Sequence, residues 1–95
     1  MAYRIFETNE FKKSLRELGA AAETRIATKL RRSVYPALVS NPRFGPQIKR
    51  LQGYEPPTWR YRVGDWRFFY VIEEGEKVVS MLMAEHRKEA YTAHG

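Results

Sequence analysis

The chain has 95 residues, and its 17 lysines and arginines against 11 aspartates and glutamates give a formal net charge of +6. This charge favours polyanionic partners such as nucleic acid, an acidic protein or an anionic membrane surface. A hydrophobic fraction of 43% with 14% aromatic residues excludes a disordered chain, and the length predicts one domain over residues 1–95. The sequence has no cysteine, which excludes disulfides and cysteine-based metal sites, and no apolar run approaches the roughly 20 residues of a membrane span.

The first half of the chain predicts a strand followed by two helices. Side chains alternate in character over residues 3–7, and Thr8 or Asn9 can cap the helix that follows. Gly19 is expected to end this helix, whose apolar residues recur at helical spacing: Phe11, Leu15 and Leu18.

The second helix has an apolar residue at every fourth position: Ala22, Ile26, Leu30 and Val34. Pro36 is expected to kink or end it, because proline lacks an N–H donor, and a last turn can continue through Leu38. The short connection at Gly19 predicts that the two helices form an antiparallel hairpin.

The second half predicts four strands, over residues 48–51, 59–63, 66–72 and 77–84, followed by one short helical turn over residues 86–91. The order β-α-α-β-β-β-β predicts an α+β domain, with the helical hairpin packed on a mostly antiparallel, twisted sheet.

The central hairpin is the most informative part of the sequence. If Gly64 and Asp65 form its two-residue turn, Arg62 lies opposite Arg67 and Arg60 lies on the same face. Like charges directly opposite each other destabilise a sheet, so this arrangement points to a bound anion, with phosphate as the obvious candidate. The alternative is a solvated sheet face. Only one of the neighbours Lys49 and Arg50 can join that face, because side chains alternate along a strand.

The register of the last hairpin stays open at this point. A two-residue turn at Glu74-Gly75 places Leu82 opposite Arg67, and a three-residue turn places Met83 there. The pattern therefore does not decide which side chains from Glu85 to Arg87 share a face with Arg67.

The order and spacing of four segments resemble the RelE/ParE toxin superfamily of type II toxin–antitoxin pairs. The segments are Asn41-Pro42, residues 48–53, residues 59–70 and the ending His86-Arg87-Lys88-Glu89-Ala90-Tyr91. The resemblance covers nearly the whole chain and implies a RelE-like fold, with the RelE branch favoured.

The resemblance implies a metal-independent endoribonuclease that cleaves messenger RNA on the ribosome, inhibits translation and uses the RNA 2′-hydroxyl as nucleophile. In this pattern Arg60, Arg62 and Arg67 surround the phosphate, and the ending adds Arg87 and Tyr91. His86 has the natural pKa for proton transfer, but Glu85 and His86 stand where RelE-type toxins carry further positive charge, which leaves the general acid and base open. Further RNA-binding candidates are Lys49 and Arg50.

The resemblance leaves two other functions open: a ParE-type poison of DNA gyrase without nuclease activity, and a non-enzymatic RNA-binding or antitoxin-sequestering protein. Either toxin implies an acidic, partly disordered antitoxin that covers or distorts the arginine face. We further expect ribosomal RNA contacts and a cytoplasmic location, without signal peptide, membrane contact or cofactor. We expect no metal site, since His86 and His94 alone do not make a ligand set.

Overall fold

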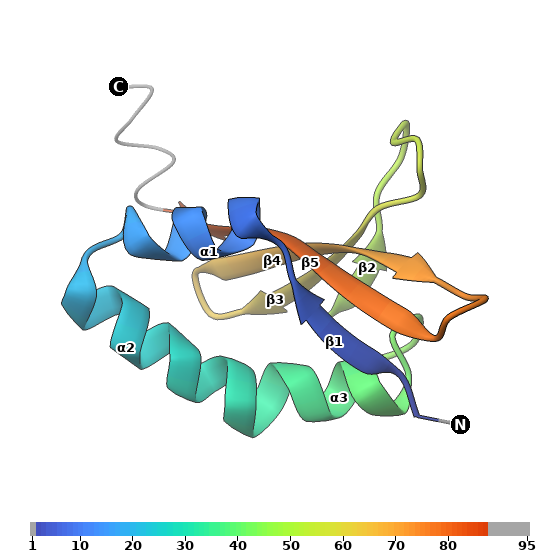
Figure 1. Ribbon diagram of the computed structural model, residues 1–95, viewed down its shortest axis with the longest axis horizontal. Helices are drawn as coiled ribbons and strands as arrows, with labels where there is room; N and C mark the ends of the chain where they lie inside the picture. The colour runs from blue at the N-terminus through green and yellow to red at the C-terminus, as the bar shows by residue number, and fades with distance from the viewer. Residues whose placement is uncertain (1, 88–95) are drawn as a thin grey trace.

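The computed structural model describes residues 2–87, which form a five-stranded sheet with helices packed against it (Figure 1). The elements in chain order are β1 (Arg4–Glu7), α1 (Asn9–Arg16), α2 (Ala20–Lys29), η1 (Leu30–Val34, a π-helical segment), α3 (Tyr35–Ser40), β2 (Ile48–Arg50), β3 (Trp59–Val63), β4 (Trp66–Glu73) and β5 (Val78–His86). The strand order is β1-β5-β4-β3-β2; β1 runs parallel to β5 and the other neighbours are antiparallel. The predicted α+β class with a mostly antiparallel sheet is confirmed. Among these residues, no helix has both the length and the apolar character that crossing a membrane requires.

The first helix begins as predicted but ends earlier. The Thr8 hydroxyl accepts a hydrogen bond from the Phe11 N–H at 3.1 Å, so Thr8 rather than Asn9 is the cap. The prediction that Gly19 ends this helix is wrong, because α1 stops at Arg16. Gly19 instead begins α2: its φ of 97° is accessible to glycine, and its carbonyl accepts the N–H of Glu23.

The helix that contains Pro36 runs on to Ser40, and Figure 1 shows α2 and α3 joined end to end along one side of the sheet. Of the two effects expected of Pro36, it does not end the helix. The helix is interrupted just before it by a π-helical segment, and the turn expected to continue through Leu38 is present. In the π-helical segment just before it, the N–H of Tyr35 donates to the carbonyl of Leu30, five residues back. This wider turn accommodates a residue that has no N–H to donate and whose ring crowds the preceding turn.

The core lies between the helices and one face of the sheet. The helices contribute Phe11, Leu15, Ile26, Leu30, Val34 and Leu38, and the strands contribute Tyr61, Phe68, Tyr70, Val79, Met81 and Ala84. The buried Tyr70 hydroxyl donates to the carbonyl of Pro42 at 2.7 Å, which fixes the loop after α3 on the sheet. Because Tyr61 and Phe68 point into this core, their neighbours Arg60 and Arg67 point to the opposite, open face.

The register of β4 and β5 differs from both alternatives that the sequence left open. Glu73 pairs with Val78, so the turn runs from Glu74 to Lys77, and Lys77 adopts a positive φ of 55°. An irregularity between Phe69 and Tyr70 then shifts the register by one more residue. As a result Glu85 lies opposite Arg67, in place of Leu82 or Met83, and β5 continues beyond its predicted end to His86.

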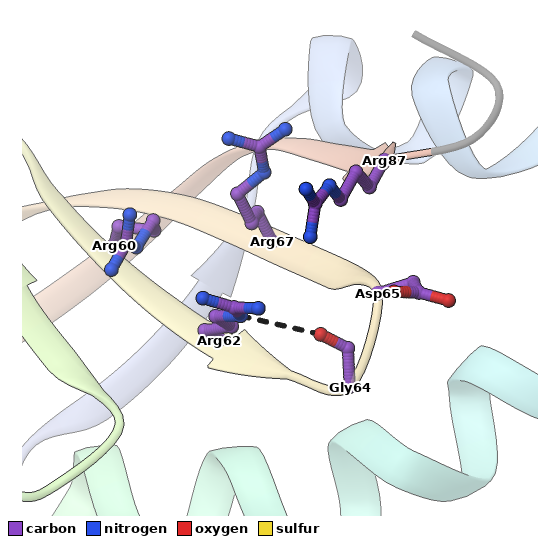
Figure 2. Close-up of a pocket in the computed structure, with 6 residues that line it drawn as sticks. All are labelled: Arg60, Arg62, Gly64, Asp65, Arg67 and Arg87. Atoms are coloured by element: carbon purple, nitrogen blue, oxygen red, sulfur yellow. Dashed lines mark hydrogen bonds between the residues drawn. The ribbon is translucent and has the colours of Figure 1, made fainter. Parts of the chain in front are cut away.

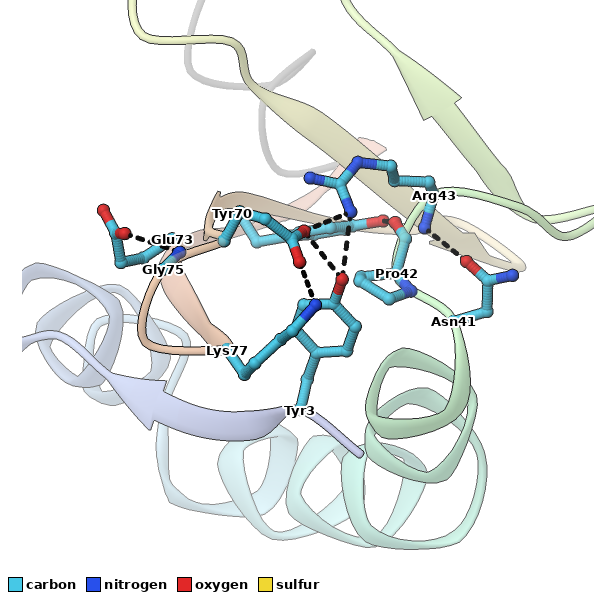
Figure 3. Close-up of polar contacts among 9 residues, drawn as sticks. Tyr3, Asn41, Pro42, Arg43, Tyr70, Glu73, Gly75 and Lys77 are labelled. Carbon is cyan, nitrogen blue, oxygen red and sulfur yellow. Dashed lines mark hydrogen bonds and ion pairs between the residues drawn. The ribbon is translucent and has the colours of Figure 1, made fainter. Parts of the chain in front are cut away.

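A polar cluster fastens this turn to the start of the chain and to the loop after α3 (Figure 3). The Glu74 carboxylate is paired with the Lys77 ammonium, and it accepts a hydrogen bond from the Tyr3 hydroxyl at 2.8 Å and contacts the Arg43 guanidinium at 2.8 Å. These partners, Lys77 foremost, lower the pKa of Glu74 to about 2.

The depressed pKa of Glu74 predicts how acid affects folding. A carboxyl group with a lowered folded-state pKa stabilises the protein above its unfolded pKa of about 4.3 and loses that contribution as the pH falls toward 2. Glu74→Gln should therefore unfold at lower urea concentration than the parent at pH 7, and the difference should shrink between pH 4.3 and 2. Glu76→Gln, in the same turn, is the control. A difference that stays constant over this range would contradict the assignment.

Candidate anion-binding site

Four arginines line one cavity of about 260 Å³ at the turn end of the central hairpin, together with Gly64 and Asp65 (Figure 2). We call this set, Arg60, Arg62, Arg67 and Arg87, the arginine cluster. Figure 2 shows their side chains gathered over the hairpin. The sequence placed the first three on one face, and Arg87, which the resemblance added to them, lines the same cavity.

The hairpin register positions the cluster. Arg62 pairs with Arg67 and Val63 pairs with Trp66, so Gly64 and Asp65 form the two-residue turn, as predicted. Gly64 has a φ of 56°, a conformation that side chains disfavour and that this type of turn requires. The N–H of Arg87 donates to the carbonyl of Asp65 at 2.8 Å, which extends the pairing of β4 with β5 and holds Arg87 next to the turn.

The arginine cluster carries more positive charge than its surroundings neutralise. Arg67 Nη2 lies 3.2 Å from Glu85 Oε1, with each side chain about one-third exposed, and the Arg62 Nε–H donates to the Gly64 carbonyl at 3.3 Å. Arg60 Nε is buried and has no hydrogen-bond partner within residues 2–87. The two nearby carboxylates, Glu85 and Asp65, cannot balance four guanidinium groups, so the cavity is suited to an anion with several acceptor oxygens.

The structure separates the two candidates on β2. Lys49 pairs with Arg60 and therefore lies on the face of the arginine cluster. Arg50 pairs with Trp59 and lies on the other face, where both residues line a different pocket with Arg43. Lys49 is thus the β2 cation that can extend the cluster.

His86 does not join the arginine cluster. It pairs with Trp66 on the opposite face, one position away in the alternation from Glu85 and Arg87. Its ring meets that of Trp66 edge to face, with centroids 4.3 Å apart, and its buried Nδ1 has no partner within the described part of the chain. Tyr91, His94 and most of the predicted helical turn over residues 86–91 lie outside the described residues.

A second depression adjoins the arginine cluster on the same face and was not foreseen from the sequence. This apolar groove has a volume of about 520 Å³ and is lined by Thr8, Glu10, Tyr54, Thr58, Phe69, Leu82, Met83 and Glu85. Tyr54 and Met83 are among the few exposed large apolar residues, 57% and 46% exposed. The sequence signal was the pair of residues Leu82 and Met83 in a strand, but without the register they could not be assigned to a face. Among residues 2–87, no three histidines or acidic residues are grouped to hold a metal ion.

Comparison with known proteins places this fold among bacterial and archaeal toxins. Residues 5–91 match the family described as ParE toxin of type II toxin–antitoxin system, parDE. A search of curated protein sequences gave no match.

Several solved structures share the fold. The toxin–antitoxin complex RelBE2 from Mycobacterium tuberculosis aligns with a TM-score of 0.70 and 22% identity over 92% of this chain and 93% of that one. A metal-bound toxin from Helicobacter pylori aligns with a TM-score of 0.68 and 21% identity over 94% and 98% of the two chains. The archaeal RelE–RelB complex from Pyrococcus horikoshii aligns with a TM-score of 0.63 and 25% identity over 92% and 97%.

Proposed function

The chain belongs to the ParE toxin family of type II toxin–antitoxin systems, and we propose that it acts as RelE-type toxins do, by cleaving messenger RNA on the ribosome. The observation that supports cleavage is the arginine cluster. Strands β3 and β4 and Arg87, the residue after β5, bring four guanidinium groups to one small cavity, and this geometry suits a phosphate.

The cluster supplies what phosphoryl transfer needs most. When the RNA 2′-hydroxyl attacks the adjacent phosphorus, the 2′-oxygen–phosphorus bond forms, the bond from phosphorus to the 5′-oxygen breaks, and negative charge grows on the non-bridging oxygens. Preorganised donors stabilise that charge. We assign this role to Arg60, Arg62, Arg67 and Arg87, with Lys49 contacting the neighbouring RNA backbone.

The groups that move protons belong to the same proposal. The 2′-hydroxyl must lose a proton and the leaving 5′-oxygen must gain one. Tyr91 stays our prediction for a donor or for a ring that stacks on a base. We give His86 no contact with the phosphate, because it lies on the opposite face of the sheet against Trp66.

We also propose a cognate antitoxin as partner. The toxins of Mycobacterium tuberculosis and Pyrococcus horikoshii were solved in complexes with their antitoxins, and the net charge of +6 suits an acidic partner here. An acidic chain laid over the arginine cluster would keep phosphate out of it.

Cleavage is tested by primer extension on messenger RNA from cells briefly induced for the protein. We expect discrete cuts inside translated codons, and we expect Arg60→Ala to weaken them strongly because it removes one donor from the cavity. Arg16→Ala, an exposed arginine at the end of α1, should cut like the parent. Intact messenger RNA in growth-arrested cells would overturn the proposal.

The second candidate function is poisoning of DNA gyrase, and the match to the ParE family favours it. In that case messenger RNA stays intact while purified protein inhibits supercoiling of plasmid DNA by gyrase. The two assays on the same preparation therefore separate the candidates.

A further inference from the structure

We propose that the apolar groove beside the arginine cluster binds one nucleobase of the RNA, and that Glu85 makes guanine the preferred base. The inference rests on the proposed function, because it takes the ligand of the arginine cluster to be RNA. It assigns a binding site to residues that have no part in binding the phosphate.

The groove and the arginine cluster share a border. Glu85 lines the groove, and its Oε1 lies 3.2 Å from Nη2 of Arg67, which lines the phosphate cavity. The pairing of Arg60 with Phe69, and of Phe69 with Met83, puts both depressions on the open face. A phosphate held by Arg67 therefore has its own nucleoside within reach of the groove.

The lining of the groove suits a flat, largely apolar group. Phe69 and the exposed ring of Tyr54 offer aromatic faces, and Leu82 and Met83 offer aliphatic contact. Unpaired RNA bases are commonly held by stacking on such side chains. Thr8 and Thr58 complete the wall, and their hydroxyls already donate to the carbonyls of Met81 and Pro56.

The charges in the groove determine which part of a nucleotide enters it. Within residues 2–87 its charged lining residues are Glu10 and Glu85, both acidic, so these side chains repel a phosphate, which stays with the arginines. An uncharged base is not repelled, and carboxylates accept hydrogen bonds from its N–H groups.

The carboxylate at the shared border distinguishes the bases. Guanine presents two adjacent N–H donors on its pairing edge, from the ring nitrogen and the exocyclic amine, which match a carboxylate as an arginine fork does. Adenine and cytosine present one amine beside an acceptor nitrogen, and uracil presents one N–H between two carbonyls. Glu85 should therefore favour guanine.

The test uses the protein labelled with ¹³C at its methionine methyl groups and titrated separately with the 3′-monophosphates of guanosine, adenosine, cytidine and uridine. Met83 lies in the groove and Met81 is fully buried in the core, so Met81 is an internal control. We expect the Met83 methyl signal to shift with guanosine 3′-monophosphate and Met81 to stay unchanged. Guanosine should bind about tenfold more tightly than the other three, as expected for a good bidentate contact.

Two variants locate the preference. Glu85→Gln replaces one acceptor oxygen by a donor, and we expect the guanosine preference to fall to within about twofold while phosphate-dependent binding persists. Glu76→Gln, an exposed glutamate in the β4–β5 turn, should keep the tenfold preference. Amide spectra of both variants report whether the fold is retained.

Three outcomes would overturn the inference. They are equal binding of all four nucleotides, a Met83 signal that no nucleotide shifts although inorganic phosphate binds, and a Met83 signal that only the antitoxin shifts. The titration reads binding without cleavage. If messenger RNA is cut and any of these outcomes is seen, only the proposal of a base site is rejected. If guanosine 3′-monophosphate binds and messenger RNA is not cut, only the proposal of nuclease activity is rejected.

Discussion

Replacing Arg67 by alanine should lower the rate of messenger RNA cleavage on programmed ribosomes by about 10²- to 10³-fold, the effect of removing one donor from a site where charge develops. Arg67 is the member of the arginine cluster that faces another arginine across the hairpin and a carboxylate on β5. Single-turnover cleavage at saturating toxin measures the chemical step separately from ribosome binding. Arg67→Lys keeps the charge but loses the planar fork, and we expect an intermediate rate.

The substitution also leaves Glu85 without its partner, and that effect needs its own control. A double variant, Arg67→Ala with Glu85→Ala, removes both charges at once. If loss of phosphate contact causes the defect, the double variant stays slow. Recovery of the parental rate in the double variant would show that the unpaired carboxylate, not the missing guanidinium, had blocked the site. Arg16→Ala should cleave at the parental rate.

Replacing Phe68 by alanine should cost about 3–5 kcal/mol of the free energy of unfolding, which is a large share of the stability of a small domain. Phe68 is fully buried in the centre of β4, between Tyr61 on β3 and Ala84 on β5. Urea unfolding followed by circular dichroism gives the free energy, provided that the variant still folds.

The adjacent residue is the matched control. Phe69 is the same residue type on the same strand but faces the open side of the sheet, where it is half-buried in the groove. Phe69→Ala should therefore cost clearly less than Phe68→Ala. Similar costs for the two variants would mean that the assignment of the two faces is wrong. If the Phe68→Ala variant is too unstable to purify, the milder variant Phe68→Leu takes its place. We expect Phe68→Leu to fold and to lose less of the free energy of unfolding.

The central hairpin could be predicted because its turn chemistry is local. Gly64 and Asp65 are typical of a two-residue turn. Because side chains alternate along a strand, this turn assigns every side chain from Arg60 to Phe69 to one or the other face of the sheet. The α+β class followed from the order of the elements, each with a clear period. Three arginines of the candidate site were therefore found together before the fold was known.

The last hairpin could not be predicted in the same way. Its turn runs from Glu74 to Lys77, with Lys77 at positive φ, and the register shifts by one residue between Phe69 and Tyr70. Neither feature has a distinct sequence signal. Each slip of one residue reverses the faces, so the positions of Glu85 and His86 stayed open. The apolar groove was missed for the same reason, since it forms only when Met83 reaches the open side. The choice between a kink and an end of the helix at Pro36 also stayed open, because the widened helical turn that tolerates proline depends on packing rather than on propensity.

The position of β5 within the sheet has a consequence for synthesis of the protein. β5, the last strand within residues 2–87, stands between β1 and β4, and the register of Arg4 with Val78 pairs it with the first of these strands. Chains are made from the N-terminus onward, so a nascent chain has the hairpin that carries Arg62 and Arg67 well before it has the strand that flanks it. Until residues 78–87 emerge, the sheet is split, and Glu85 and Arg87 are missing from the site. The toxin therefore completes its binding face only after residues 78–87 have been made.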